Sequence, residues 1–317
     1  MDKKNPRFKS DSIQSNASGR GAPAQNSPWP DPKQFLARER PARSNVSATA
    51  SGRAAAARDE GQTPVQRRGE ELRVYGRNAC LAVFARRPLD VRKVHLSEAR
   101  IPEFKQVLAW CVKHRLGYRV VENDDLDRLT EAQHHEGVCF EVRRQAPVSL
   151  STLLQGISSP AQPVLLVWLD GVGNPHNVGA MLRSAANFAV RGLILAAGAP
   201  TLPAAAIRVA EGGAEVVPVA RVQVGENVAS LLRGAGFQIA ATVPRDGAQL
   251  YESALPPRLV LIFGAEGEGM SNDLLRNADL RLTIPGSGAV ESLNVAASAA
   301  VLFAEYWRQH HGREKSC

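Results

Sequence analysis

The sequence predicts an α/β protein whose main part is a mostly parallel sheet covered by helices on both faces. Three observations support this prediction. From Val164 onward, strand-like and helix-like segments alternate along the chain. The apolar runs at 164–169 and 258–263 are continuous, which is typical of strands buried on both faces. Polar, glycine-containing loops follow several of these strands, where sheets of this kind bind their ligands.

Residues 1–70 differ from the rest of the chain in composition. They are rich in Ser, Ala, Pro and Arg, poor in large apolar side chains, and carry 13 Lys and Arg against 7 Asp and Glu. Such a segment buries too little apolar surface to offset its ordering entropy, so we expect a disordered basic tail. Its charge suits a loose electrostatic contact with RNA, and a solubilising tail without a specific task explains it equally well.

Residues 71–146 are predicted to form a small α/β unit. Apolar residues at helical spacing predict helices at 72–85, 101–114 and 126–129. Alternating or apolar segments predict strands at 91–96, 117–121 and 138–142. Residues 147–162, which contain Pro147 and Pro160, are predicted to be a linker with one short helix inside it.

The main domain is predicted at 163–312, followed by a short C-terminal tail at 313–317. After the strand at 164–169, we expect helices at 178–188, 204–211, 228–235, 272–277 and 295–309. We expect the further strands at 192–196, 215–219, 238–242, 258–263 and 280–284.

The composition is compatible with an anionic partner and gives no sign of a metal site or a membrane segment. The chain of 317 residues is 44% hydrophobic and carries a net charge of +8 at pH 7. Its four cysteines (Cys80, Cys111, Cys139 and Cys317) lack metal-binding spacing, so we expect reduced thiols and no metal. No apolar run reaches membrane-spanning length and no apolar segment follows the N-terminus, so we expect a cytoplasmic location.

The first polar loop follows the strand at 164–169. Asn177 is expected to cap the helix that follows, and Arg183 lies six residues further on. At about 100° per residue, the two side chains do not share one face of that helix. Asn offers both a donor and an acceptor, and Arg offers a planar fork suited to phosphate. The plainer alternative is a cap and a surface charge.

Two further loops have a similar character. Gly264, Glu266 and Gly267 follow the strand at 258–263, where glycines permit a ligand to approach closely. A tight turn is the plainer alternative. Near the C-terminus, Ser292 and Asn294 would face the same way in an extended segment. The alternative is that Ser292 caps the last helix and Asn294 lies in its first turn.

In this order, the three loops resemble the three motifs of the SpoU-type (TrmH-like) RNA 2′-O-ribose methyltransferases of the SPOUT superfamily. The resemblance covers about residues 164–309, and the string at 290–295, Val-Glu-Ser-Leu-Asn-Val, is its most specific part. The string at 73–79 resembles the start of the L30e-like substrate-binding domain that many members carry, and the string at 134–138 resembles its closing motif. Departures include Gly286, where many members have Met, a loosely matching stretch at 208–215, and the long N-terminal tail.

The resemblance implies a C-terminal trefoil knot that binds S-adenosylmethionine, a homodimer, and methyl transfer to a ribose 2′-hydroxyl of rRNA or tRNA. Carried over residue by residue, the catalytic positions are Arg183, Asn177, Glu266, Ser292 and Asn294. The cofactor-binding positions are Gly264, Glu266, Gly267, Ile284, Ser292, Leu293 and Asn294. In the family proposal Arg183 becomes the base. Because a guanidinium rarely loses its proton, a phosphate clamp that orients the hydroxyl is the safer role.

Target selection is assigned to residues 71–146 and the tail, with RNA contacts expected from Arg73, Arg77 and Arg183. Basic residues that could also contact phosphates are Arg86, Arg87, Arg92 and Lys93. Two rival functions remain at this point. One is a non-catalytic RNA-binding or ribosome-assembly factor on the same fold. The other is a nicotinamide-dependent oxidoreductase, although the first loop lacks the G-x-G-x-x-G pattern that such enzymes use.

Overall fold

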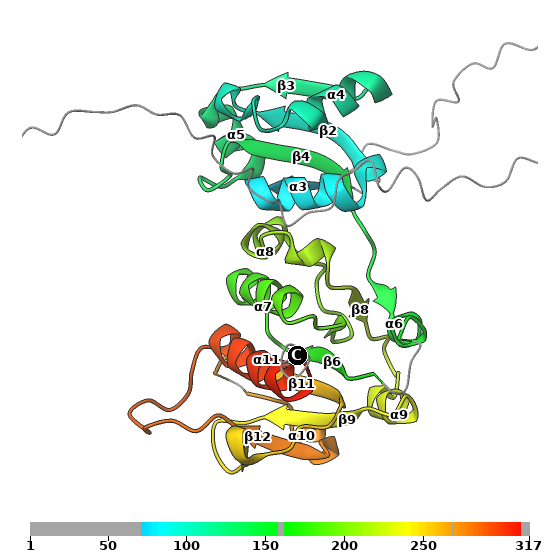
Figure 1. The fold of residues 1–317 in the computed structure, drawn as a ribbon, viewed down its shortest axis with the longest axis vertical. Coiled ribbons are helices and arrows are strands. Elements are labelled where there is room, and N and C mark those ends of the chain that lie inside the picture. The colour runs from blue at the N-terminus through cyan, green and yellow to red at the C-terminus, as the bar shows by residue number, and fades with distance from the viewer. Residues whose placement is uncertain (1–70, 158–161, 268, 312–317) are drawn as a thin grey trace, which may run out of the picture.

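The chain builds two separate sheets, which lie one above the other in Figure 1. The computed structural model describes residues 71–157, 162–267 and 269–311. The expected disordered tail at 1–70 and the expected C-terminal tail at 313–317 therefore lie outside the described residues. Within those described ranges, no helix is long and apolar enough to cross a membrane.

The smaller sheet is made by the first part of the described chain. Its strands are β1 (Glu71–Tyr75), β2 (Val91–Leu96), β3 (Gly117–Val120) and β4 (Val138–Arg143), in the order β1-β4-β2-β3. The helices α3 (Arg77–Arg86) and α4 (Lys105–His114) pack on one face, and α5 (Asn123–Thr130) packs on the other. β1 and β2 run antiparallel to β4, and β3 runs parallel to β2.

Residues 72–75 form a strand, so the predicted helix at 72–85 is wrong over its first turn. Leu72 and Val74 are buried while Arg73 is exposed, which is the two-residue period of a strand. Gly76, with a φ of 93°, separates this strand from α3. In the sequence, this short apolar segment fits the period of a helix and that of a strand equally well. It becomes a strand because it pairs with β4.

The larger sheet is parallel throughout its described pairings, which confirms the predicted architecture. Its order among the described residues is β10-β12-β9-β11-β6-β7-β8-β5. The strands are β5 (Val148–Ser149), β6 (Val164–Asp170), β7 (Gly192–Leu195), β8 (Val219–Arg221), β9 (Gln238–Thr242), β10 (Ala248–Gln249), β11 (Arg258–Gly264) and β12 (Leu280–Thr283).

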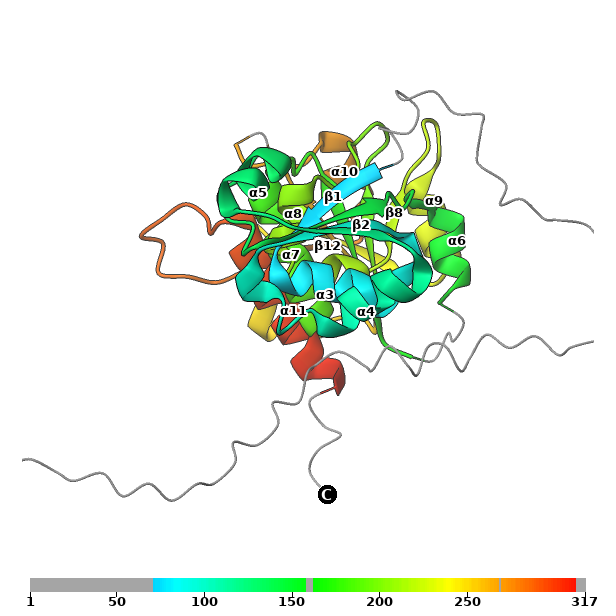
Figure 2. The ribbon, with the colours of Figure 1, turned by 90° about the horizontal axis from the view of Figure 1, so that it is seen from above.

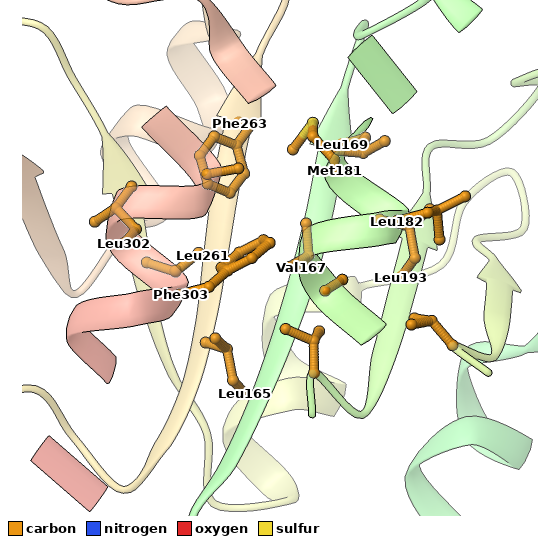
Figure 3. Packing of buried hydrophobic residues seen from close by; sticks show 14 of the residues in the cluster. Leu165, Val167, Leu169, Met181, Leu182, Leu193, Leu261, Phe263, Leu302 and Phe303 are labelled. Carbon is orange, nitrogen blue, oxygen red and sulfur yellow. The ribbon is translucent and has the colours of Figure 1, made fainter. Parts of the chain in front are cut away.

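Helices cover both faces of this sheet. The helices α7 (Pro175–Asn187), α8 (Ala204–Val209) and α11 (Val295–His311) lie on one face, and α6 (Leu150–Gln155) and α9 (Val228–Gly234) lie on the other. Figure 3 shows the first layer, where Val167 and Leu261 of the sheet belong to one apolar cluster with Leu182 of α7 and Phe303 of α11. The rings of Phe263 and Phe303 meet edge to face at 6.1 Å. Packing of this kind fixes α7 and α11 relative to the strand ends.

Two predicted segments differ from the structure. Part of the predicted linker belongs to the larger sheet, because β5 pairs in parallel with β8 and α6 follows directly, capped by Ser149. The predicted strand at 215–219 is wrong over most of its length. A short 3-10 turn, η3 (Gly213–Glu215), occupies its beginning, and β8 starts only at Val219. The left-handed Gly212, with a φ of 93°, turns the chain there before it can extend.

Candidate active site

Three loops follow β6, β11 and β12 at the carboxyl edge of the larger sheet. β6 and β11 are neighbours, and Asp170 at the end of β6 pairs with Gly264 at the end of β11. The loops lead into α7, α10 (Asn272–Asn277) and α11, respectively. Because parallel strands end at the same edge, the three loops gather on one side of the molecule, on the left in Figure 1.

Side chains from the three motifs meet in one hydrogen-bonded cluster, Asn177, Glu266 and Asn294, which we call the loop hub. Nδ2 of Asn177 donates to Oε1 of Glu266 over 2.8 Å. Nδ2 of Asn294 donates to the same oxygen over 3.0 Å and to Oδ1 of Asn177 over 3.1 Å. The carboxylate is a charged acceptor, so its two amide bonds are of the stronger kind. The loop hub therefore ties three segments that are far apart in the sequence.

The prediction that Asn177 caps α7 is wrong. Asn174 is the cap, and its Oδ1 accepts from the backbone N–H of His176 over 2.9 Å. Pro175 occupies the first helical position, where its fixed φ and missing N–H are tolerated best. Asn177 is the third residue of the helix, is only 9% exposed, and has its side chain in the loop hub instead.

Asn294 is the cap of α11, so the alternative that Ser292 caps this helix is wrong. Oδ1 of Asn294 accepts from the backbone N–H groups of Ala296 over 2.9 Å and Ala297 over 3.3 Å. The same side chain donates from Nδ2 to the loop hub. One amide thus fixes the start of α11 and joins it to the other two loops.

Arg183 lies on α7 with its side chain exposed, away from the buried face that carries Asn177. This agrees with the predicted angular separation. In the part of the chain that the structure describes, no hydrogen bond or ion pair engages the Arg183 guanidinium. The exposed planar cation on α7 is thus open to an anionic ligand.

The second loop is a glycine turn held by its own backbone. Ala265 and Gly269 exchange two backbone hydrogen bonds of 3.0 Å each, and Gly267, with a φ of 90°, lies exposed at the tip. A Cβ on Gly264 would lie 2.5 Å from the carbonyl carbon of Gly269, so only glycine fits there.

Asp170 is a residue of this site that sequence reasoning missed. Its Oδ2 accepts from the backbone N–H of Ser271 over 2.9 Å, which joins the first loop to the end of the second. The available signal was an acidic residue placed directly after a buried strand.

The third loop projects from the body of the protein in both Figure 1 and Figure 2, between β12 and α11. Ile284 is half-buried, and residues 285–294 are exposed. Val290 is 70% and Leu293 49% exposed. Ser292 is also exposed, and the structure does not bring it into the loop hub.

The predicted RNA contacts divide between the two sheets. Arg73 donates from Nη1 to the carbonyl of Leu129, and Arg77 pairs with Glu103. Arg87 does not face solvent and is therefore removed from the RNA candidates. Its side chain is 9% exposed and forms a bidentate salt bridge with the buried Glu215. Nε and Nη2 of Arg87 each donate to one carboxylate oxygen over 2.8 Å.

Taken together, the edge of the larger sheet offers three kinds of recognition. The loop hub offers amide and carboxylate groups, the glycine turn offers close approach to the backbone, and Arg183 offers a cation. These groups match the hydroxyls, ring nitrogens and phosphates of nucleotides.

Comparison with known families matches both parts of the chain. Residues 164–304 match the model of the SpoU rRNA Methylase family. Residues 73–148 match the model described as RNA 2′-O ribose methyltransferase substrate binding.

Individual relatives agree with these matches. An uncharacterized tRNA/rRNA methyltransferase, YfiF, of Escherichia coli O157:H7 is 34% identical over 77% of this chain and 70% of its own length. The 23S rRNA (guanosine-2′-O-)-methyltransferase RlmB of Pseudomonas putida is 32% identical over 75% of this chain and 96% of its own. The crystal structure of an AdoMet-bound rRNA methyltransferase from Sinorhizobium meliloti shares the fold, with a TM-score of 0.63, 23% identity, and coverage of 77% of this chain and 89% of that one.

Proposed function

The chain belongs to the SpoU rRNA Methylase family, and on this premise we propose that it transfers a methyl group from S-adenosylmethionine to a ribose 2′-hydroxyl of RNA. The loop hub is the observation that carries the proposal. Asn177, Glu266 and Asn294 come from three separate motifs, and their side chains bond directly to one another. Relatives named as 23S rRNA guanosine-2′-O-methyltransferases make ribosomal RNA the first substrate to test, with tRNA as the second.

The residues present fit S-adenosylmethionine. The glycine turn packs Gly264 against its own Gly269, while Gly267 is exposed with open space around it, so its backbone can approach an adenosine closely. We assign the cofactor to Gly264, Glu266, Gly267, Ile284, Ser292, Leu293 and Asn294. When bound, S-adenosylmethionine supplies an electrophilic methyl group on a sulfonium sulfur. No metal enters this proposal.

The task of the protein is then to align the ribose and to assist loss of its proton. Arg183 is exposed on α7 and would hold an RNA phosphate through its planar fork, which orients the 2′-hydroxyl. Asn177 and Glu266 would hold the loops in register around that hydroxyl, since their side chains already bond to each other. Ser292, exposed on the third loop, would contact the bound nucleotide. In this assignment Arg183 remains protonated and acts as a clamp.

The substrate-binding unit at 71–146 would receive the RNA, with Arg73 and Arg77 as contacts. The main domain at 163–312 would carry the chemistry, with 147–162 between them. A basic tail at 1–70 would add electrostatic attraction. We place the protein in the cytoplasm, where its RNA substrates would be processed.

We also propose that the third loop takes part in a trefoil knot and that two copies of the chain form a homodimer. Membership of the family is the main support for both. For the dimer, further support comes from the exposed apolar side chains of Val290 and Leu293 beside the site, since a partner subunit would cover them.

Isothermal titration with S-adenosylmethionine, followed by transfer of a tritiated methyl group to rRNA and tRNA, tests the function. We expect cofactor binding and label in a ribose of one RNA, with the label lost in Arg183→Ala. Binding without transfer to any RNA would favour the non-catalytic RNA-binding factor. Absence of cofactor binding would refute the proposal.

A further inference from the structure

A short segment of the larger domain, residues 204–215, lies between the smaller sheet and α7. It comprises α8 and η3, and we call it the docking segment. Figure 1 shows α8 below α3 and above α7, and Figure 2 shows α8 close to β1 when the molecule is seen from above. The docking segment therefore touches both the substrate-binding unit and the helix that carries Arg183.

Its upper side completes the core of the substrate-binding unit. Ile207 is 5% exposed and belongs to the same apolar cluster as Val74 and Phe84. Ala204 and Ala214 pack against that cluster from the same segment. Ile207 of the larger domain is thus part of the core of the smaller one. Such a buried contact holds the two domains together more firmly than a surface contact would.

Polar contacts surround this apolar contact. Arg208 donates from Nε to the carbonyl of His134 over 2.5 Å, and its Nη2 lies 3.3 Å from Oε1 of Glu136. Nδ2 of Asn78 donates to Oε2 of Glu211 over 2.6 Å. The buried pair of Arg87 and Glu215, described above, closes the far end.

Glu136 joins the docking segment to the start of α3. Its Oε2 accepts from the backbone N–H of Arg77 over 2.9 Å, while Oε1 faces Arg208. Gly76 lies between them, and a Cβ there would come within 3.0 Å of Cγ of Arg208. The Arg208 side chain is therefore packed as well as paired.

The lower side of the docking segment packs on α7 at backbone distance. A Cβ on Gly179 would lie 2.6 Å from the carbonyl oxygen of Ala206. A Cβ on Gly213 would lie 2.7 Å from the carbonyl oxygen of Leu182 and 3.2 Å from Cα of Arg183. The two backbones are therefore in direct contact, so a shift of the docking segment would displace the backbone at Arg183.

We infer that the docking segment holds the substrate-binding unit and Arg183 in one fixed spatial relation, and that Arg208 is a positioning residue which determines which ribose is methylated. This inference rests on the proposed function. The substrate-binding unit would bind the RNA and place its ribose beside α7, which carries Arg183. The distance between the two is set by Arg208, Ile207 and Gly213 rather than by a flexible linker.

Arg208→Gln and Arg233→Gln form a matched pair for the test. Arg233, on α9, also bonds one carbonyl, of Asn277, and one carboxylate, of Asp279, but it does not belong to the docking segment. Each variant of the full chain is assayed for kcat and KM on the RNA that the wild type methylates, and the methylated riboses are mapped.

For Arg208→Gln we expect kcat to fall about 10-fold to 100-fold, because a misplacement of about 1 Å can cost that much. KM for RNA and the affinity for S-adenosylmethionine should stay unchanged, and methyl groups should appear on riboses next to the target. Arg233→Gln should behave as the wild type. Unchanged kinetics and sites in Arg208→Gln, a rise in KM alone, or an equal loss in both variants would each overturn the inference.

A second measurement does not depend on activity. Spin labels at Leu89→Cys and Tyr251→Cys, which are exposed positions in the two domains, report the interdomain distance once Cys317 is replaced by Ser. The remaining cysteines (Cys80, Cys111 and Cys139) are buried. With labelled chains diluted in an excess of unlabelled chains, so that a dimer holds one labelled copy, we expect one narrow distance distribution that broadens in Arg208→Gln but not in Arg233→Gln. A distribution that is broad from the start refutes the fixed relation, and one that stays narrow in Arg208→Gln refutes the positioning role of Arg208, even if no RNA is methylated.

Discussion

Asn177 and Asn294 are 117 residues apart in the chain, yet Nδ2 of Asn294 donates to Oδ1 of Asn177 over 3.1 Å. Both amides also donate to the same oxygen of Glu266. With its own Oδ1, Asn294 caps α11, so its orientation is set by a helix on one side and by two loops on the other. A substitution of Asn294 should therefore have two separable effects, one on the stability of the fold and one on cofactor binding.

Two substitutions at Asn294 separate these effects. Asn294→Ala removes both the cap and the donor, so we expect a stability loss of about 1 kcal/mol together with loss of cofactor affinity. Asn294→Asp keeps a capping acceptor but removes the donor and places a carboxylate next to Glu266. Thermal unfolding should show Asn294→Asp less stable than the wild type, because the retained cap is opposed by repulsion between the two carboxylates, and titration should show weakened S-adenosylmethionine binding. Equal affinity in Asn294→Asp and wild type would contradict a role of the loop hub in binding the cofactor.

Arg183→Ala should abolish methyl transfer while leaving the fold and cofactor binding intact. The side chain is exposed, and the described residues offer it no partner, so its removal costs little stability. The expected loss is at least about 100-fold in kcat, as for other transition-state contacts to charge. Arg191→Ala, at an exposed position just after α7, is the control. Single-turnover methyl transfer with saturating RNA is the measurement, and activity within a few-fold of wild type would disprove the assignment.

Gly213→Ala should destabilise the protein, because the added methyl would meet the backbone of α7 at 2.7 Å. Overpacking of this kind costs about 1–3 kcal/mol. Gly234→Ala is the matched control, since a Cβ there has open space around it and Ala favours a helix over Gly. Chemical denaturation should show the first variant less stable than the wild type and the second equal or more stable. The opposite order would mean that η3 can move away from α7.

Stability should fall as the pH is lowered, and His95 should account for part of the fall. Burial lowers the pKa of the His95 imidazole, helped by Lys93 and Arg119 and opposed by Glu141, whose Oε1 lies 3.0 Å from Nε2. The unfolded chain then takes up a proton more readily than the folded one. The contribution of His95 is therefore fully present above the ordinary histidine pKa of about 6.5 and is lost as the pH drops below it.

Melting temperatures recorded from about pH 7.5 to about pH 5.5 check this slope. His310, whose pKa is also lowered by burial, contributes with the same sign. We therefore expect His95→Gln to flatten the slope without removing it. The exposed His176→Gln should leave the slope unchanged. A slope that is as steep in His95→Gln as in the wild type would refute the prediction.

Much of the larger domain could be predicted from the sequence. The continuous apolar runs at 164–169 and 258–263 predict buried strands, which are β6 and β11, and the helix predicted at 272–277 coincides with α10. Errors occurred where two local patterns overlap. Residues 72–75 satisfy both helical and strand spacing, and the apolar residues at 216–217 continue a turn instead of a strand. Pairing with β4 makes 72–75 a strand, and the turn at Gly212 keeps 216–217 out of one.

By itself, the sequence determined the parallel α/β architecture and the three motifs with their candidate residues, because burial period and motif spacing are local properties of the chain. Only the tertiary structure decided that Asn174 and Asn294 are the caps, that Arg87 is buried against Glu215, and that 204–215 fills the core of another domain. These outcomes depend on which strands lie side by side and in what register. Contacts between residues far apart in the chain do not appear in the periodicity of the sequence, because that periodicity reflects only neighbouring residues.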